Sequence, residues 1–100
     1  MEALLADEAD VKEGETLEID FSGRPAILIR VGGEIKAYIN CCTHLGGPVK
    51  LDGDILHCQW HGTDFDAATG EALTPPAPVG SKLIALPIKI KGGKVYYVYP

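Results

Sequence analysis

The sequence predicts an all-β fold, an antiparallel β-sandwich or barrel built as one domain over residues 1–100. Short apolar or alternating segments recur along the chain, and pairs of turn residues separate them. No segment has the apolar period of a helix of useful length. The stretch from about 40 to 78 lacks this regularity, so we expect it to be an excursion inserted between strands that carries the site. The remaining residues would then form a basal β domain.

The first third of the chain begins with an apolar run at residues 1–6, which predicts a first strand. Residues 7–10 form an acidic turn or one helical turn, too short for a stable helix. Residues 16–21 alternate polar and apolar side chains, as a half-buried strand does. Ser22-Gly23 then predicts a tight turn.

The next strands lead into and between the two motifs of the excursion. Residues 25–31 are almost continuously apolar, which indicates a strand buried on both faces. Gly32-Gly33 predicts a hairpin that returns through a strand at 34–39. Asp52-Gly53 predicts another hairpin, which returns the chain through residues 54–57. Each motif therefore follows a strand and enters a loop.

The chain ends in a further predicted hairpin. Residues 83–90 and 95–99 are rich in β-branched, aliphatic and aromatic side chains, and Gly92-Gly93 lies between them. With these two strands the pattern of an antiparallel all-β domain is complete.

The most informative pattern is a pair of motifs, Cys42-Thr43-His44 and Cys58-Gln59-Trp60-His61, separated by thirteen residues. Each motif offers one thiolate and one imidazole. Zinc modules more often place two Cys on one arm and two His on the other, or use four Cys. In a [2Fe–2S] cluster with two His and two Cys, one iron takes both imidazoles. Each loop must then supply one ligand to each iron, and these motifs can do so.

The extended segments at 42–48 and 58–66 resemble the two cluster-binding boxes of Rieske iron–sulfur proteins. The turn at 68–71 and the proline-rich run at 75–78 resemble the turn and third loop that cover the cluster in that family. The resemblance implies a [2Fe–2S] cofactor with four ligands, Cys42, His44, Cys58 and His61. It implies a surrounding shell formed by Gly46, Gly47, Trp60, Gly62, Thr63, Pro75 and Pro76.

Some positions depart from the high-potential members of that family. Those proteins carry an extra Cys in each box, joined as a disulfide, where this chain has Gly47 and Trp60. They also carry a Ser and a Tyr hydroxyl near the cluster, where this chain has Thr63 and Phe65. The sequence therefore resembles the soluble, low-potential ferredoxins that carry single electrons from a flavin reductase to a ring-hydroxylating or related oxygenase. One hundred residues leave no room for a catalytic mononuclear iron domain, so we expect a carrier and not an enzyme.

Net charge and cysteine count indicate which partners and which cell compartment to expect. The formal net charge of −5 disfavours nucleic acid and anionic membranes, and it suits a basic docking face on a redox protein. With Cys42 and Cys58 as ligands, Cys41 remains a single thiol, which indicates a reducing compartment. There is no signal-peptide pattern and no apolar run of the ~18 residues that span a bilayer. We expect a cytoplasmic monomer.

Two other functions remain open at this point. The same four Cys and His side chains suit a structural zinc site in an interaction module. The chain could also be a small Rieske-like subunit of a larger redox complex such as nitrite reductase, although such subunits often lack the ligands. A chance arrangement of two buried Cys and two surface His is the simplest alternative.

Overall fold

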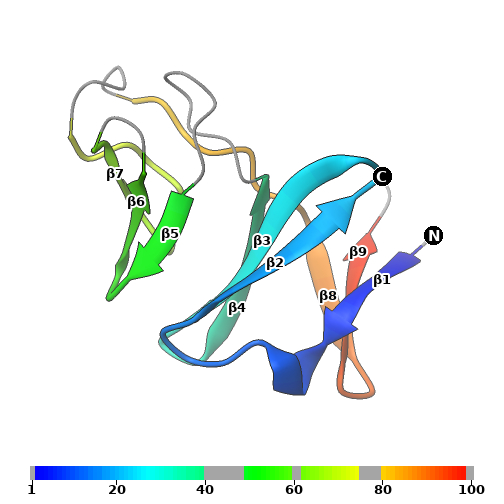
Figure 1. Ribbon diagram of the computed structural model, residues 1–100. Coiled ribbons are helices and arrows are strands. Elements are labelled where there is room, and N and C mark those ends of the chain that lie inside the picture. The colour runs from blue at the N-terminus through cyan, green and yellow to red at the C-terminus, as the bar shows by residue number, and fades with distance from the viewer. Residues whose placement is uncertain (1, 40–48, 60–61, 75–79, 99–100) are drawn as a thin grey trace.

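The computed structural model describes residues 2–39, 49–59, 62–74 and 80–98. Within these ranges the chain forms three antiparallel three-stranded sheets, with strand orders β1-β9-β8, β2-β3-β4 and β5-β6-β7 (Figure 1). We call them the outer, middle and inserted sheets. The strands are β1 (Glu2–Asp7), β2 (Thr16–Phe21), β3 (Arg24–Val31), β4 (Glu34–Ile39), β5 (Val49–Asp52), β6 (Ile55–Cys58), β7 (Asp64–Asp66), β8 (Ile88–Lys91) and β9 (Lys94–Val98). A single 3-10 turn, η1 (Glu8–Asp10), follows β1.

The all-β prediction is confirmed, and the inserted sheet lies in the chain between β4 and β8. The acidic turn expected after the first strand is η1. Strand β7 was not predicted from the sequence, since its residues were read only as part of the second motif. No helix in the described ranges has the length and apolar character needed to cross a bilayer.

The middle sheet separates two apolar cores, and β3 contributes to both. Ala26 and Leu28 belong to one core and Ile27 and Ile29 to the other, and all four are fully buried. Successive strand residues point to opposite faces, so a strand buried on both faces must be apolar at every position. The interpretation of a strand buried on both faces is therefore confirmed for residues 26–29, whereas Pro25 is exposed and Arg30 and Val31 are half-buried.

Each core joins the middle sheet to one neighbour. The first contains Ile27, Ile29, Tyr38, Val49, Leu51, Leu56, Cys58, Phe65, Ala67 and Leu83, and it joins the middle sheet to the inserted sheet. The second contains Val11, Ala26, Leu28, Ile35, Ala37, Ile39, Leu86 and Val95, with the outer sheet packed on it. Figure 1 accordingly shows the middle sheet between the other two.

Two-residue turns set the register of the hairpins. Ser22 and Gly23 have φ values of 52° and 84°, as the type I′ turn requires, so the turn predicted there is confirmed. The turn predicted at Asp52-Gly53 is displaced by one residue, because Asp52 pairs with Ile55 and Gly53-Asp54 occupy the centre. Gly53 has φ 64° at the first central position, where the type II′ turn demands glycine.

The single strand predicted for residues 83–90 is wrong over its first half. Strand β8 begins only at Ile88, and residues 82–86 form a connecting segment instead. Pro87 has no N–H to donate, so it interrupts a continuous ladder. The connecting segment bonds to both neighbouring sheets: Ile39 N donates to Ile84 O at 2.9 Å, and Leu83 N donates to Gly70 O at 2.8 Å.

Gly70 lies where the turn after β7 meets the middle sheet. A Cβ added to it would lie 2.9 Å from Cε1 of Tyr38 and 3.5 Å from Cβ of Leu83. Its φ of +79° also belongs to the region that side chains rarely adopt. The close approach of Tyr38 therefore needs a residue without a side chain at position 70.

We expect Gly70→Ala to destabilise the protein more than Gly93→Ala. Both glycines have a positive φ, 79° and 77°, but nothing lies within 4 Å of a Cβ at position 93. The strain is shared, so the difference measures the overlap with Tyr38, which we expect to cost about 1–3 kcal/mol. Denaturant unfolding of the two variants measures it. Equal losses of stability would show that Tyr38 moves aside freely.

Candidate metal centre

Cys58 is the one predicted ligand that lies within the described residues. It is the last residue of β6, it pairs with Val49 of β5, and its side chain is 1% exposed. It faces the first core together with Leu56 and Phe65. Strand alternation turns the neighbouring His57 to the exposed face, so His57 does not share the face of Cys58.

The second motif is closed by two backbone hydrogen bonds. Cys58 N donates to Thr63 O at 2.8 Å, and Gly62 N donates to Cys58 O at 3.1 Å. Gly62 has φ +80°, which the turn requires. Gly62, which the resemblance places in the shell around the cluster, thus donates its N–H to the carbonyl of the neighbouring ligand position.

Thr63 lies opposite Cys58 at the end of this hairpin and is fully buried. Like the hydroxyl of Tyr38, its hydroxyl is held in the interior, where a polar group is hydrogen-bonded. Phe65 lies in β7, two residues after Thr63, and it is also fully buried and pairs with Leu56. This side of the hairpin therefore has a hydroxyl opposite the Cys58 position and, two residues later, an aromatic ring without a hydroxyl.

The remaining predicted site residues lie outside the described ranges. These are Cys42, His44 and His61 among the ligands, and Gly46, Gly47, Trp60, Pro75 and Pro76 around them. The structure does describe the element before the first motif, since β4 ends at Ile39. Tyr38 of β4 and Cys58 of β6 belong to the same core. The strands that precede the two motifs are therefore packed together.

The donor set fits a Rieske cluster. A thiolate buried as deeply as Cys58 is unfavourable without a positive partner, and bound iron supplies that charge. Two thiolates and two imidazoles from the two motifs would complete the set. Burial by itself also suits a small core residue, which free Cys often is.

Tyr38 connects the strand before the first motif to the turn after β7. Its side chain is 2% exposed, and its hydroxyl donates to Ala67 O at 2.9 Å. Burial raises the pKa of Tyr38 above its usual value of 10.0, and the negative charge of Asp66 raises this pKa further. The phenol proton is thus held inside the joint between the two sheets.

Sequence reasoning missed a polar link on the outer face of the inserted sheet. His57 Nδ1 lies 2.6 Å from Asp64 Oδ1, across the register of β6 and β7. Alternation alone places His57 on that face, but its partner depends on β7, which was not predicted. No sequence signal pairs the two residues.

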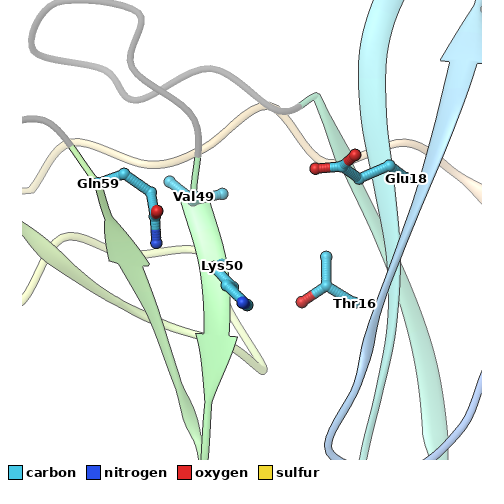
Figure 2. Close-up of a pocket in the computed structure, with 5 residues that line it drawn as sticks. All are labelled: Thr16, Glu18, Val49, Lys50 and Gln59. Carbon is cyan, nitrogen blue, oxygen red and sulfur yellow. The ribbon is translucent and has the colours of Figure 1, made fainter.

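A cleft of about 450 Å³ separates the edges of β2 and β5. Figure 2 shows Thr16 and Glu18 on one side of it and Val49, Lys50 and Gln59 on the other. A hydrogen bond crosses between these strands, from Leu51 N to Thr16 Oγ1 at 3.0 Å. The first core and the connecting segment also join the two sheets.

Comparison with known proteins decides the family. The family model of the Rieske [2Fe–2S] domain matches residues 2–88. This chain belongs to the Rieske family. It is 36% identical over 89 residues to the ferredoxin component of the naphthalene 1,2-dioxygenase system of Pseudomonas aeruginosa, covering 86% of this chain and 84% of that protein.

Two solved structures share the Rieske fold over nearly the whole chain. The Sphingomonas yanoikuyae B1 ferredoxin superposes with a TM-score of 0.86 and 30% identity, covering all of both chains. A chain of the complex of reduced oxygenase and oxidized ferredoxin in carbazole 1,9a-dioxygenase gives a TM-score of 0.82 and 28% identity. That match covers 96% of this chain and 91% of the other.

These findings confirm several predictions. The cofactor is a [2Fe–2S] cluster, as the family description says. The chain is an electron carrier of the Rieske ferredoxin type and not itself an enzyme, as its ferredoxin relatives indicate. The likeness extends over the full ferredoxin length, which favours a carrier over a zinc module or a subunit of nitrite reductase.

We expect Tyr38→Phe to destabilise the protein by about 1–2 kcal/mol near neutral pH, because the Ala67 carbonyl loses its donor. The loss should shrink above pH ~10, since the unfolded wild-type chain ionises before the folded one and wild-type stability falls. Below the usual pKa of 10.0 both states keep the proton, so the difference is constant there. Denaturant unfolding between about pH 8 and pH 11 measures it.

The half-buried Tyr96 of β9 supplies the control, as Tyr96→Phe removes a hydroxyl from the other side of the molecule. A Tyr38→Phe loss no greater than that of Tyr96→Phe would show that the Ala67 bond adds nothing to stability.

Proposed function

We propose that this chain passes single electrons to the terminal oxygenase of a Rieske oxygenase system, after receiving them from a flavin reductase. The proposal that an oxygenase accepts the electron rests on one observation, the likeness to a chain of the solved complex of oxygenase and ferredoxin in carbazole 1,9a-dioxygenase. The naphthalene dioxygenase relative supports it, because its name places a ferredoxin beside a dioxygenase. The flavin reductase rests on the sequence resemblance.

The ligand set that we propose is Cys42 and Cys58 for one iron and His44 and His61 for the other. The bound cluster would supply one-electron redox chemistry. The chain's own residues hold and shield it. The end of β6 fixes the backbone of Cys58, and the first core keeps water from its side chain. Thr63 offers a hydroxyl donor beside the Cys58 position. Gly46, Gly47, Trp60, Gly62, Pro75 and Pro76 complete the shell that we propose.

We further propose a cytoplasmic monomer with one domain, in which residues 40–78 form the cluster-binding excursion. An unpaired Cys41 beside a ligand supports a reducing compartment. The net charge of −5 supports brief docking to basic faces of the reductase and oxygenase, and it disfavours nucleic acid and membrane partners.

The purified protein should hold two irons and two acid-labile sulfides and give a rhombic electron paramagnetic resonance signal only when reduced. The reduced holoprotein should then reoxidise on mixing with a Rieske terminal oxygenase, in a stopped-flow experiment that follows the visible band. Raising the ionic strength should slow this step, because opposite charges steer the encounter. Colourless protein with one zinc would end the proposal, and a reduced protein inert toward every terminal oxygenase tested would remove the acceptor.

The reduction potential should lie in the negative part of the ≈ −150 to +300 mV range of Rieske centres. Thr63 carries a hydroxyl that can donate a hydrogen bond, whereas Phe65 carries none. Thr63→Val should therefore lower the potential by tens of millivolts, since ~30 mV in a one-electron couple is about 0.7 kcal/mol, within the worth of one hydrogen bond.

Phe65→Tyr is the opposing variant, and it should raise the potential by a similar amount. Spectroelectrochemical titration of the holoproteins measures both shifts. Full reduction of the wild type by ascorbate at neutral pH would place it with the high-potential class and contradict the ferredoxin assignment.

A further inference from the structure

We propose that Asp64 is a positioning residue of the metal centre, which fixes the hairpin carrying Cys58 and ties the chain before residues 75–79 to that hairpin. The inference rests on the proposed ligand role of Cys58. Asp64 touches neither Cys58 nor the cluster in this account. It acts through three hydrogen bonds to other parts of the chain, and each comes from a different group of the residue.

The carboxylate makes the first bond, 2.6 Å from Asp64 Oδ1 to His57 Nδ1. The two residues are directly opposite each other in β6 and β7. His57 immediately precedes Cys58, and Asp64 immediately follows Thr63. This side-chain bond therefore links the two strands on the outer face of the hairpin. It lies one register position from the backbone hydrogen bond between Cys58 N and Thr63 O.

The backbone of Asp64 makes the other two bonds. Its N–H donates to Thr74 Oγ1 at 2.9 Å, and its carbonyl accepts from Leu73 N at 2.7 Å. Thr74 is the last described residue before the proline-rich segment at 75–79. One residue thus holds the second motif and the entry to the third segment against each other.

This arrangement matters because the sequence excludes one other brace, a disulfide between positions 47 and 60. High-potential Rieske proteins join their two boxes by a disulfide, and Gly47 and Trp60 exclude it here. The potential of an iron–sulfur cluster depends on hydrogen bonds to its sulfurs and on solvent exposure. A looser hairpin would alter both, because the Cys58 and Thr63 positions sit at its closed end.

The effect should be modest. The side chains of His57 and Asp64 remain 47% and 32% exposed, so water competes for their bond. The backbone bonds to Leu73 and Thr74 are retained in any variant that changes only the carboxylate. Substitution of Asp64 thus tests the outer bond, and substitution of Thr74 tests the tie to the third segment.

The decisive comparison is between Asp64→Asn and Asp64→Ala in the holoprotein. Both remove the same negative charge, but Asn keeps an oxygen that can accept from His57, so the difference isolates the hydrogen bond. We expect loss of the visible band to an iron chelator to be about fivefold faster for Asp64→Ala than for Asp64→Asn, which corresponds to ~1 kcal/mol. The reduction potential and the resonance g-values should also shift in Asp64→Ala and return toward wild type in Asp64→Asn.

Asp52→Ala is the matched control, since Asp52 is an exposed carboxylate on the same face of the sheet, two register positions from the row of His57 and Asp64. It should leave the g-values and the chelation rate unchanged. Identical potentials, spectra and chelation rates for Asp64→Asn and Asp64→Ala would overturn the inference, as would an Asp52→Ala effect equal to that of Asp64→Ala. Wild-type protein without a Rieske spectrum would instead overturn the proposed function.

Thr74→Val keeps the test usable if Asp64→Ala does not fold. It removes the oxygen that accepts from Asp64 N and keeps the shape of the side chain. Thr69→Val is its control, because the Thr69 hydroxyl accepts from Glu71 N at 3.2 Å within the turn after β7. Faster chelation for Thr74→Val than for Thr69→Val supports the inference, and equal rates contradict it.

Discussion

The structure depends on the apolar core shared by the middle and inserted sheets. A cluster with ligands from two separate motifs needs two strands held in one arrangement, and here β4 leads to the first motif and β6 ends in the second. Tyr38 and Cys58 lie in that one core. Apolar packing is not directional, so hydrogen bonds must fix how the two sheets are placed against each other. The Tyr38 hydroxyl and the connecting segment provide such hydrogen bonds. The core thus holds the sheets close together, and these hydrogen bonds fix their relative position.

Much of this fold was readable from the sequence, where local chemistry determines the result. The apolar run of β3 predicted a strand buried on both faces, and Ser22-Gly23 predicted the tight turn that the structure shows. The errors arose where the outcome depends on distant partners. The connecting segment has the composition of a strand, but it bonds first to the turn after β7 and then to the middle sheet. Pro87, which has no N–H, then interrupts its backbone hydrogen bonds. Strand β7 is only three residues long and exists through its pairing with β6.

The site shows the same division. The residue types and spacing of the two motifs indicated the family, which the comparisons confirm. The buried position of Cys58 follows from alternation along β6, given that Leu56 is apolar. The contacts of Asp64 do not follow from any pattern, because they join three segments whose alignment the whole inserted sheet determines. The bond from Gly62 N to the Cys58 carbonyl likewise depends on how the turn closes, which residue type alone does not determine.

Charge acts on this protein at two ranges. The segments 40–48, 60–61 and 75–79 contain no Asp, Glu, Lys or Arg, so the fixed side-chain charges of the motif segments 42–48 and 58–66 come from Asp64 and Asp66. Neither carboxylate stabilises the added electron, so the reduced cluster depends on hydrogen-bond donors and on burial. Thr63 and the hairpin that ends at Cys58 are important for this reason. The other acidic residues lie on the surrounding strands and turns. These charges bias the approach of a basic partner, and salt weakens that attraction. Surface charge therefore acts on the encounter with a partner, whereas the potential depends on hydrogen bonds and burial close to the cluster.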